Sequence, residues 1–236
     1  MIETHAVVSR EAWLEARRQF LAREKAFTRE RDQLSAERRA LPWVRVDKSY
    51  VFDTTKGKQT LAGLFDGRSQ LIVYHFMFGP DWEEPCRGCS FWADNFNGIP
   101  VHLRHRDVTL LAVSSAPLDQ IDRLKQRMGW TFTWVSSGGG DFNHDYNVSF
   151  TRDELAAGEV TCNYARMKTS MTELPGISVF YQDAPGAVFH TYSCYARGLD
   201  MMNGAFHYLD LVPKGRDDAD LHPRMQWVRL HDRYGD

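Results

Sequence analysis

The sequence predicts an α/β domain in which helices flank a central mixed sheet. Two nearly continuous apolar runs, residues 70–78 and 107–115, are typical of strands that are buried on both faces. Segments that can form helices follow them, at residues 87–96 and 118–128. Because buried strands that alternate with helices form parallel pairs by right-handed crossover, we expect a parallel core. A hairpin over residues 176–192 is expected to add antiparallel strands at one end.

The segment that precedes this domain, residues 1–42, is expected to consist mainly of one long helix. Residues 9–40 contain no Gly or Pro, and Ser9 is a natural N-cap. A coiled coil needs two apolar positions in each heptad, and residues at the second position are mostly charged in this segment. The sequence therefore predicts an amphipathic helix with a single apolar stripe, docked on residues 43–236 or on a second subunit in a homodimer. The stripe recurs every seven residues, at Trp13, Phe20, Phe27, Leu34 and Leu41.

The remaining elements follow from local alternation, turn residues and caps. Short alternating stretches predict strands at residues 44–46, 50–52 and 132–135. Thr151 and Glu154 form a capping box that opens a short helix, which Gly158 ends. A last helix is expected around residues 199–209.

Composition narrows the class of protein. The chain has 236 residues, of which 43% are hydrophobic and 25% are charged, as in globular domains rather than disordered chains. Its net charge of -2 lacks the basic footprint of a nucleic-acid-binding protein. The longest apolar run is too short to cross a bilayer, and the first ten residues lack the apolar region of a signal peptide. We therefore expect a cytoplasmic protein with neither nucleic acid nor a membrane as partner.

Cys86 and Cys89 form a Cys-x-x-Cys motif shortly after the first buried strand, where the next helix begins. In a reducing compartment this spacing indicates redox or metal chemistry rather than a structural disulfide. Free N–H groups and the helix dipole lower the pKa of a thiol at a helix N-terminus. The charge of Arg87 adds to this effect, whereas Glu83 and Glu84 oppose it, and the sequence does not rank the two contributions. We predict that Cys86 is the nucleophile and that Cys89, one turn inside the helix, is the resolving cysteine.

Two other interpretations of the motif remain open. The two cysteines could be inert packing residues, as we expect of Cys162 and Cys194. They could also bind a soft metal ion together with His144 or His190, since thiolates and imidazole suit such ions. A structural zinc site is disfavoured, because no second Cys-x-x-Cys motif supplies further ligands. His75, inside the first buried strand, is expected to be a core histidine, with a metal-assisting role as the alternative.

Residues around the motif are candidates for contacting a substrate or partner. Trp82 and Pro85 precede the first cysteine, and Arg87 follows it. Aromatic residues on either side of the motif would keep the site dry and offer a docking patch. Tyr192 and Arg197 lie at the end of the hairpin, where loops are expected to approach the cysteines.

Three stretches of the chain stand out together: residues 71–94 (LIVYHFMFGPDWEEPCRGCSFWAD), 107–117 (DVTLLAVSSAP) and 190–200 (HTYSCYARGLD). With them the sequence resembles the DUF899 family of bacterial thioredoxin-like, peroxiredoxin-related proteins, over essentially the whole chain. The resemblance implies a thioredoxin-like fold, and the family's cysteine motif corresponds to Cys86 and Cys89. In such folds a proline with a cis peptide bond faces the cysteines, and we expect Pro175 to take this place.

These observations predict a thiol–disulfide oxidoreductase that uses no metal or other cofactor and acts on a protein or small-molecule disulfide or thiol. The alternative of another class is a non-enzymatic module whose thiolates bind a metal or a partner. A thiol peroxidase is the third choice. Peroxiredoxins carry Pro-x-x-x-Thr/Ser-x-x-Cys, whereas Gly79 and Glu83 stand at those positions before Cys86. The same positions before Cys89 hold Trp82 and Cys86.

Overall fold

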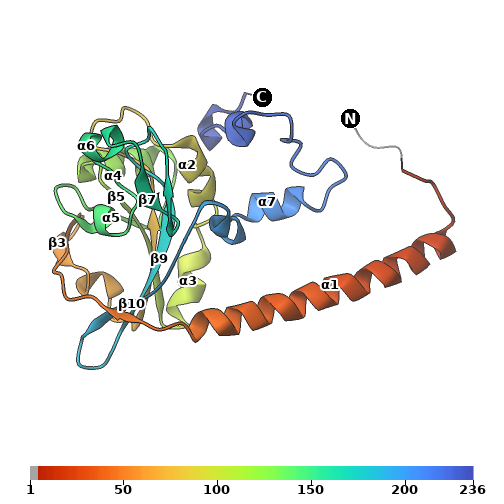
Figure 1. Cartoon of the computed structure of the whole chain (residues 1–236), viewed down its shortest axis with the longest axis horizontal. Helices are drawn as coiled ribbons and strands as arrows, with labels where there is room; N and C mark the ends of the chain where they lie inside the picture. Colours follow the sequence, from red (N-terminus) through yellow and green to blue (C-terminus); the bar gives the residue numbers. More distant parts are fainter. Residues whose placement is uncertain (1–4, 236) are drawn as a thin grey trace.

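An eight-stranded sheet forms the centre of the molecule, which a computed structural model describes from residue 5 to residue 235 (Figure 1). Its strands are β1 (Val44–Arg45), β2 (Val51–Thr54), β3 (Gly57–Thr60), β4 (Gln70–His75), β5 (Val108–Ser114), β6 (Thr133–Ser136), β9 (Gly176–Gln182) and β10 (Val188–Tyr195). Their order in the sheet is β1-β10-β9-β4-β5-β6-β2-β3. A separate small hairpin consists of β7 (Val160–Cys162) and β8 (Ala165–Met167).

The predicted fold class, an α/β thioredoxin-like fold, is confirmed. β4, β5 and β6 run parallel. On the other side of β4, the β9–β10 hairpin joins the sheet in the antiparallel direction. β4 is therefore the strand at which the parallel core meets the antiparallel hairpin, while β2 and β3 add antiparallel strands beyond β6. The chain that leaves the carboxyl end of β4 leads to the cysteine motif.

Helices and short helical turns cover both faces of the sheet. α2, α4 and α7 pack on one face, and α5 and the first 3-10 turn pack on the other. The α-helices are α1 (Arg10–Arg39), α2 (Arg87–Ala93), α3 (Ile99–Arg104), α4 (Leu118–Arg127), α5 (Phe142–Asp145), α6 (Arg152–Ala156) and α7 (Gly204–Leu209). The 3-10 turns span Gly63–Phe65, Ala196–Met202, Arg224–Trp227 and His231–Arg233.

Alternation along β4 explains why its sequence is almost wholly apolar. Leu71 and Val73 enter one core, which also contains Phe142 of α5. Tyr74 enters the other core, together with Trp92 of α2. Because successive side chains of a strand point to opposite faces, a strand with a core on each side needs apolar residues at every position.

His75 is a core histidine, as expected. Its side chain is 1% exposed, and its ring stacks on Phe142 with a centroid separation of 5.5 Å. Nδ1 lies 3.1 Å from Oδ1 of Asn143, and Nε2 lies 2.9 Å from the hydroxyl of Ser178. Burial lowers the pKa of His75 to about 4.

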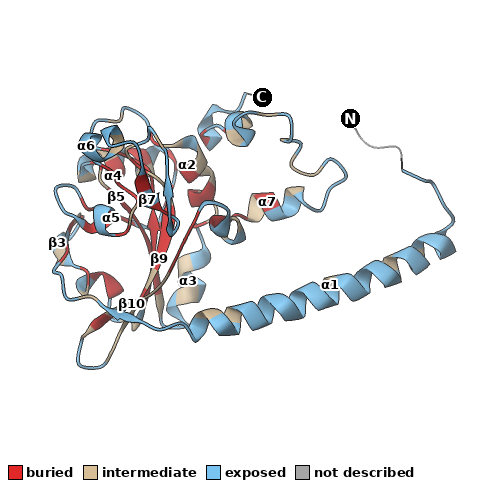
Figure 2. Cartoon of the chain, viewed as in Figure 1, coloured by how far each residue is buried: buried red, intermediate tan, exposed pale blue. Residues whose placement is uncertain are grey.

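The long N-terminal helix forms as predicted, with Ser9 as its N-cap accepting a hydrogen bond from the N–H of Ala12 at 3.3 Å. It extends away from the body and none of its residues is buried (Figures 1 and 2). Docking on the body, one of the two expected arrangements, is therefore not found. The helix ends at Arg39, with Ala40 as its C-cap, and Pro42 follows. β1 starts at Val44, at the sheet edge, so α1 projects from this corner of the fold.

Two local expectations differ from the structure. The single helix expected over residues 199–209 is divided into a 3-10 turn and α7. Asn203 causes the break, since its side chain accepts a hydrogen bond from the N–H of Phe206 and caps a new helix. The β7–β8 hairpin and β3 were not predicted. Within residues 5–235, no helix combines the length and the apolar character needed to cross a membrane.

The buried His75 predicts a loss of stability in mild acid. The pKa of His75 is about 4 in the folded state against an ordinary histidine value of 6.5, so the unfolded state binds the proton first as the pH falls. The free energy of unfolding should therefore decrease between pH 6.5 and pH 4, by about 3 kcal/mol in total. Urea unfolding at several pH values measures this.

The matched variant is His75→Gln, which keeps polar atoms in the core but does not titrate. Its unfolding free energy should depend less steeply on pH over the same range. A residual slope is expected from His190, whose pKa burial also lowers. Equal slopes for wild type and variant would contradict the assignment of the effect to His75.

Candidate active site

The loop between β4 and α2 is built to bring a cysteine to the start of a helix. Beyond β4 the chain stays attached to the sheet, with the N–H of Phe76 bonded to the carbonyl of Val113 at 2.8 Å. Gly79 then allows a close turn, because a Cβ there would lie 2.7 Å from the ring of Trp82. The N–H of Cys86 donates to the carbonyl of Met77 at 3.1 Å, which closes the loop. Cys86 is thereby the N-cap of α2.

The two cysteines differ in exposure and in hydrogen bonding. Cys86 is half-buried, whereas Cys89 is only 2% exposed. The sulfur of Cys86 accepts the backbone N–H of Cys89 at 3.5 Å. The sulfur of Cys89 accepts the backbone N–H of Met77 at 3.4 Å, so it faces the loop and the core. Both cysteines are free thiols.

This difference separates the acidities of the two thiols. The pKa of Cys86 is lowered to about 7, first by the hydrogen bond from the Cys89 thiol. The backbone N–H groups of Cys89 and Gly88 and the charge of Arg87 lower it further, against the opposing effect of burial. Burial raises the pKa of Cys89, and the neighbouring Cys86 raises it as well. At neutral pH the pair therefore consists of a partly ionised Cys86 and a protonated Cys89.

A cavity of about 660 Å³ opens onto this pair. Cys86 and Cys89 form part of its floor, and Pro175 and Arg197 also line it. The other wall comes from the region after β10, residues 196–225, which we call the C-terminal wall. Its lining side chains include Leu199, Asp200, Phe206, Asp210, Arg216, Asp218, Arg224 and Met225.

The C-terminal wall is anchored to α2 and to itself. The indole N–H of Trp92 in α2 donates to the carbonyl of Leu199 at 2.8 Å. Arg216 forms two parallel hydrogen bonds with Asp210, both of 2.8 Å, and one of 3.0 Å with Asp200. Its guanidinium also lies 4.0 Å from the ring centre of Phe206. Such a bidentate pair, stacked on an aromatic ring, fixes the geometry more strongly than an isolated surface ion pair.

Only some of the sequence-predicted contact residues reach this cavity. Pro175 and Arg197 line it with the two cysteines. Trp82 and Pro85 line a neighbouring cavity of about 530 Å³, which lies against α4. Arg87 is exposed at the start of α2 and acts on Cys86 through its charge.

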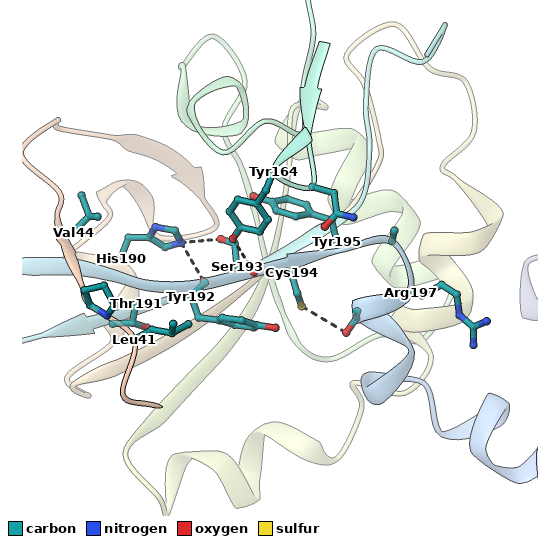
Figure 3. A pocket seen from close by; sticks show the side chains of 14 residues that line it. Leu41, Val44, Tyr164, His190, Thr191, Tyr192, Ser193, Cys194, Tyr195 and Arg197 are labelled. Carbon is teal, nitrogen blue, oxygen red and sulfur yellow. Dashed lines mark hydrogen bonds between the residues drawn. The ribbon is translucent and has the colours of Figure 1, made fainter. Parts of the chain in front are cut away.

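Tyr192 belongs to a different cavity, next to the C-terminal end of α1 (Figure 3). The guanidinium of Arg38 lies 5.0 Å from the centre of its ring. His190 and Ser193 line the same cavity and are joined by a hydrogen bond of 2.7 Å (Figure 3). Tyr192 packs against the same core as the cysteine pair, but it lines the cavity beside α1 and not the cavity at Cys86.

The prediction of a cis peptide bond before Pro175 is wrong. The cis peptide bond found in the described chain is His222-Pro223, and the bond between Leu174 and Pro175 is trans. The residues before Pro175 are already extended, with the N–H of Leu174 donating to the carbonyl of Val148 at 2.7 Å. The chain thus enters β9 without a tight turn, and the proline marks the start of a strand.

The metal-binding arrangement considered from the sequence is not assembled. Within residues 5–235, no three His, Cys, Asp or Glu side chains are grouped so that they could hold a metal ion. His144 and His190 line two other cavities. Cys162 and Cys194 are buried free thiols whose pKa is raised by burial, in keeping with a packing role.

The C-terminal wall is the part of the site that sequence reasoning missed. Phe206, Arg216 and Met225 line the same cavity as the cysteines. Phe206 lies in the region where a helix was expected, but nothing in the sequence placed that helix, Arg216 or Met225 at the cysteine pair. The only signal in the sequence is the presence of acidic and basic residues in this region, among them Asp210 and Arg216, which form an ion pair in the structure. Such charges are indistinguishable from solvated surface residues without the fold.

Comparison with known proteins identifies the family. The chain belongs to DUF899, a bacterial protein family of unknown function whose profile matches residues 2–234. None of the curated proteins matches this sequence.

Solved structures with a similar fold include peroxiredoxin Q from Xanthomonas campestris, with 16% identity and a TM-score of 0.45 over 67% of this chain and 90% of that one. The peroxidoxin BcpB from Mycobacterium tuberculosis has 10% identity and a TM-score of 0.45, over 71% of this chain and 97% of that one. Likenesses at this level do not identify a reaction.

The acidities of the two thiols predict the order in which they react. Iodoacetamide at pH 7 should alkylate Cys86 well before Cys89, because only Cys86 is half-exposed and partly ionised. The rate at Cys86 should rise with pH with a midpoint near the pKa of about 7. Peptide mass spectrometry of quenched samples measures both, and Cys162 serves as the internal buried control. Equal labelling of the pair would refute the arrangement.

Proposed function

We propose that this DUF899 protein is a thiol–disulfide oxidoreductase in which Cys86 is the nucleophile and Cys89 the resolving cysteine. The observation that supports it best is the opposite change of the two acidities within one hydrogen-bonded pair. Cys86, the more acidic thiol, borders an open cavity, whereas Cys89 lies behind it. An attacking thiol reacts fastest when its pKa is close to the ambient pH, and a pKa of about 7 meets this condition.

The reaction runs in two exchanges. The Cys86 thiolate attacks one sulfur of the substrate disulfide, so that a bond forms between Cys86 and this sulfur while the substrate S–S bond breaks. The other sulfur leaves as a thiolate and takes up a proton. Cys89 then attacks the sulfur of Cys86 and releases the second half of the substrate as a thiol. The pair is oxidised to a disulfide, and two electrons and two protons reach the substrate.

The second exchange becomes easier once the first has occurred. The negative charge of Cys86 is one reason why the pKa of Cys89 is raised. In the mixed disulfide this charge is gone, and the Cys89 thiol no longer donates a proton to a thiolate. Its pKa therefore falls at the stage at which Cys89 must ionise. Burial keeps it from reacting with other molecules before that stage.

The site does not favour a thiol peroxidase. Glu83, which stands where peroxiredoxins have the hydroxyl that orients the peroxide, is exposed and lines the neighbouring cavity. A carboxylate there would also repel the charge that develops on the peroxide oxygen. A metal-binding module is likewise unsupported, since no further ligand is placed beside the two cysteines in the described chain.

Single substitutions separate the two roles. Cys86→Ser should abolish reduction of 5,5′-dithiobis(2-nitrobenzoate), because no thiolate remains at the cavity. Cys89→Ser should still release one equivalent of thiol in a burst and then stop, since the mixed disulfide at Cys86 cannot be resolved. Mass spectrometry should show that adduct on Cys86.

Cys194→Ser is the matched control, because it removes a buried thiol outside the cavity and should leave the activity unchanged. The proposed function is excluded if neither Cys86→Ser nor Cys89→Ser changes the reduction of a disulfide. It is also excluded if the wild-type pair remains reduced in excess disulfide at pH 7.

A further inference from the structure

The C-terminal wall determines what can reach the nucleophile. We infer that the substrate of the cysteine pair is a low-molecular-weight disulfide that enters the cavity, rather than a disulfide in a folded protein; this inference rests on the proposed function. The cavity of about 660 Å³ lies within the range of about 300–1,000 Å³ in which proteins bind small molecules. A small disulfide fits into this space together with its leaving group.

Met225 lines the cavity beside Cys86, next to Gly88 of α2. A Cβ placed on Gly88 would lie 3.3 Å from Cε of Met225 and 3.6 Å from the sulfur of Cys86. The methionine is therefore within van der Waals reach of the helix turn that carries the nucleophile. A disulfide on a protein surface would have to displace this side chain before its sulfur could contact Cys86.

The wall is held in place and does not resemble a loose flap. Arg216, whose side chain is 19% exposed, joins Asp200 and Asp210 and covers Phe206. These contacts connect the 3-10 turn after β10, α7 and the loop after α7. They make the wall one connected piece, in which the carbonyl of Leu199 accepts the indole N–H of Trp92 at 2.8 Å. The N–H of Gly204 also donates to Oδ1 of Asn95 at 2.9 Å, so moving the wall aside would break both of these bonds to the body.

The lining matches an organic disulfide with an apolar group beside the sulfur and charged groups further out. Apolar side chains surround the cysteines, whereas the charged ones come from the wall and the end of the hairpin. An aromatic or peptide-sized disulfide would bury its sulfur atoms and its hydrophobic part against these apolar side chains. Its charged groups would then face the arginines and aspartates of the C-terminal wall. The apolar side chains are Tyr74, Trp92, Pro175, Leu199, Phe206 and Met225.

The test compares small and protein disulfides with the reduced full-length protein. Oxidation of the pair by glutathione disulfide, by 5,5′-dithiobis(2-nitrobenzoate) and by insulin is followed by acid quenching and mass spectrometry. Each rate is divided by the rate at which the same disulfide oxidises free dithiothreitol. This ratio corrects for the different intrinsic reactivities of the disulfides. We expect the normalised rates with the two small disulfides to exceed that with insulin at least tenfold.

Two substitutions at Met225 probe the wall itself. Met225→Trp should fill the entrance and slow the small disulfides at least tenfold, whereas Met225→Ala should open it and raise the normalised rate with insulin. Met201→Trp is the matched control, since Met201 is 56% exposed and does not line the cavity. Melting temperatures confirm that each variant is folded.

The outcomes distinguish the two claims. If no disulfide oxidises the pair in the wild type, the proposed function fails. If insulin reacts as fast as the small disulfides and neither Met225 variant changes the ratio, the inference is overturned and the proposed function stands. Slower reaction of Met201→Trp by the same factor as Met225→Trp would also overturn the role of the wall.

The apolar stripe of α1 is not covered by any other part of the described chain. Its large side chains remain 52–66% exposed along the helix, at Trp13, Phe20, Phe27 and Leu34. The 30 residues of α1 span about 45 Å, so the stripe is far longer than the scattered apolar residues of an ordinary surface. We propose that the stripe is covered by the body of a second copy of this chain.

Charge and symmetry both favour a second copy. α1 contains nine Lys or Arg and six Asp or Glu, a net charge of +3, whereas the whole chain carries -2. The rest of the chain therefore carries -5, and α1 is attracted to the body of another copy. In a two-fold dimer each α1 makes the same contact, so the buried area doubles. With about 100 Å² from each of the four large side chains, the two helices contribute about 800 Å². A similar area on the two bodies that cover them brings the total to the size of a specific interface.

The oligomeric state tests this inference. The full-length protein should be a dimer by light scattering coupled to size exclusion, and Phe20→Glu with Phe27→Glu should make it a monomer. Ala22→Glu introduces one negative charge on the opposite side of α1 and should leave the dimer intact. A monomeric wild type, or equal dissociation by Ala22→Glu, would overturn the proposal.

Discussion

The site depends on one constraint, namely that two thiols share a proton at the point where the central strand ends. β4 carries the chain to the middle of the fold, and the N–H of Cys86 stays bonded to the carbonyl of Met77 just beyond it. From there α2 can begin only with Cys86 as its cap and Cys89 one turn inside. The hydrogen bonds that Cys86 accepts, and the burial of Cys89, follow from this placement. Without the strand behind it, the motif would be two equivalent surface cysteines.

The two faces of the pair are closed by different means. Behind Cys89 lies the apolar core of the sheet, and burial there raises the pKa of Cys89, although a hydrogen bond with Tyr74 opposes this effect. In front of Cys86 lies the C-terminal wall, which is held by ion pairs and by one indole hydrogen bond rather than by regular strands. A wall of this kind can differ between related chains without any change in the sheet. It is therefore the natural place for substrate selection, whereas the core sets the reactivity.

The sequence allowed the periodic and locally coded features to be predicted, but not contacts between distant residues. Apolar runs and a capping box identified β4, β5 and α6, and the spacing of Cys86 and Cys89 identified a cysteine pair at the start of α2. Arg216 and Met225 were missed because their partners are set by loop geometry, which leaves no period in the sequence. The prediction of a cis bond at Pro175 failed because it came from a resemblance, whereas the extended pairing of Leu174 determines the conformation here. A stripe such as that of α1 shows that a face is apolar, but not which molecule covers it.

The reactivity of Cys86 is a balance that the cavity itself affects. Burial disfavours its thiolate, while the Cys89 thiol, two backbone N–H groups and Arg87 stabilise it, and the net result is a pKa of about 7. A stronger stabilisation would give more thiolate but a weaker nucleophile, since nucleophilicity falls with pKa. When a substrate enters and expels water, the electrostatic effect of those hydrogen bonds increases because the local dielectric constant drops. The cavity and the hydrogen-bonded pair therefore act together: the wall that helps to exclude water also strengthens the interactions that hold charge on the sulfur of Cys86.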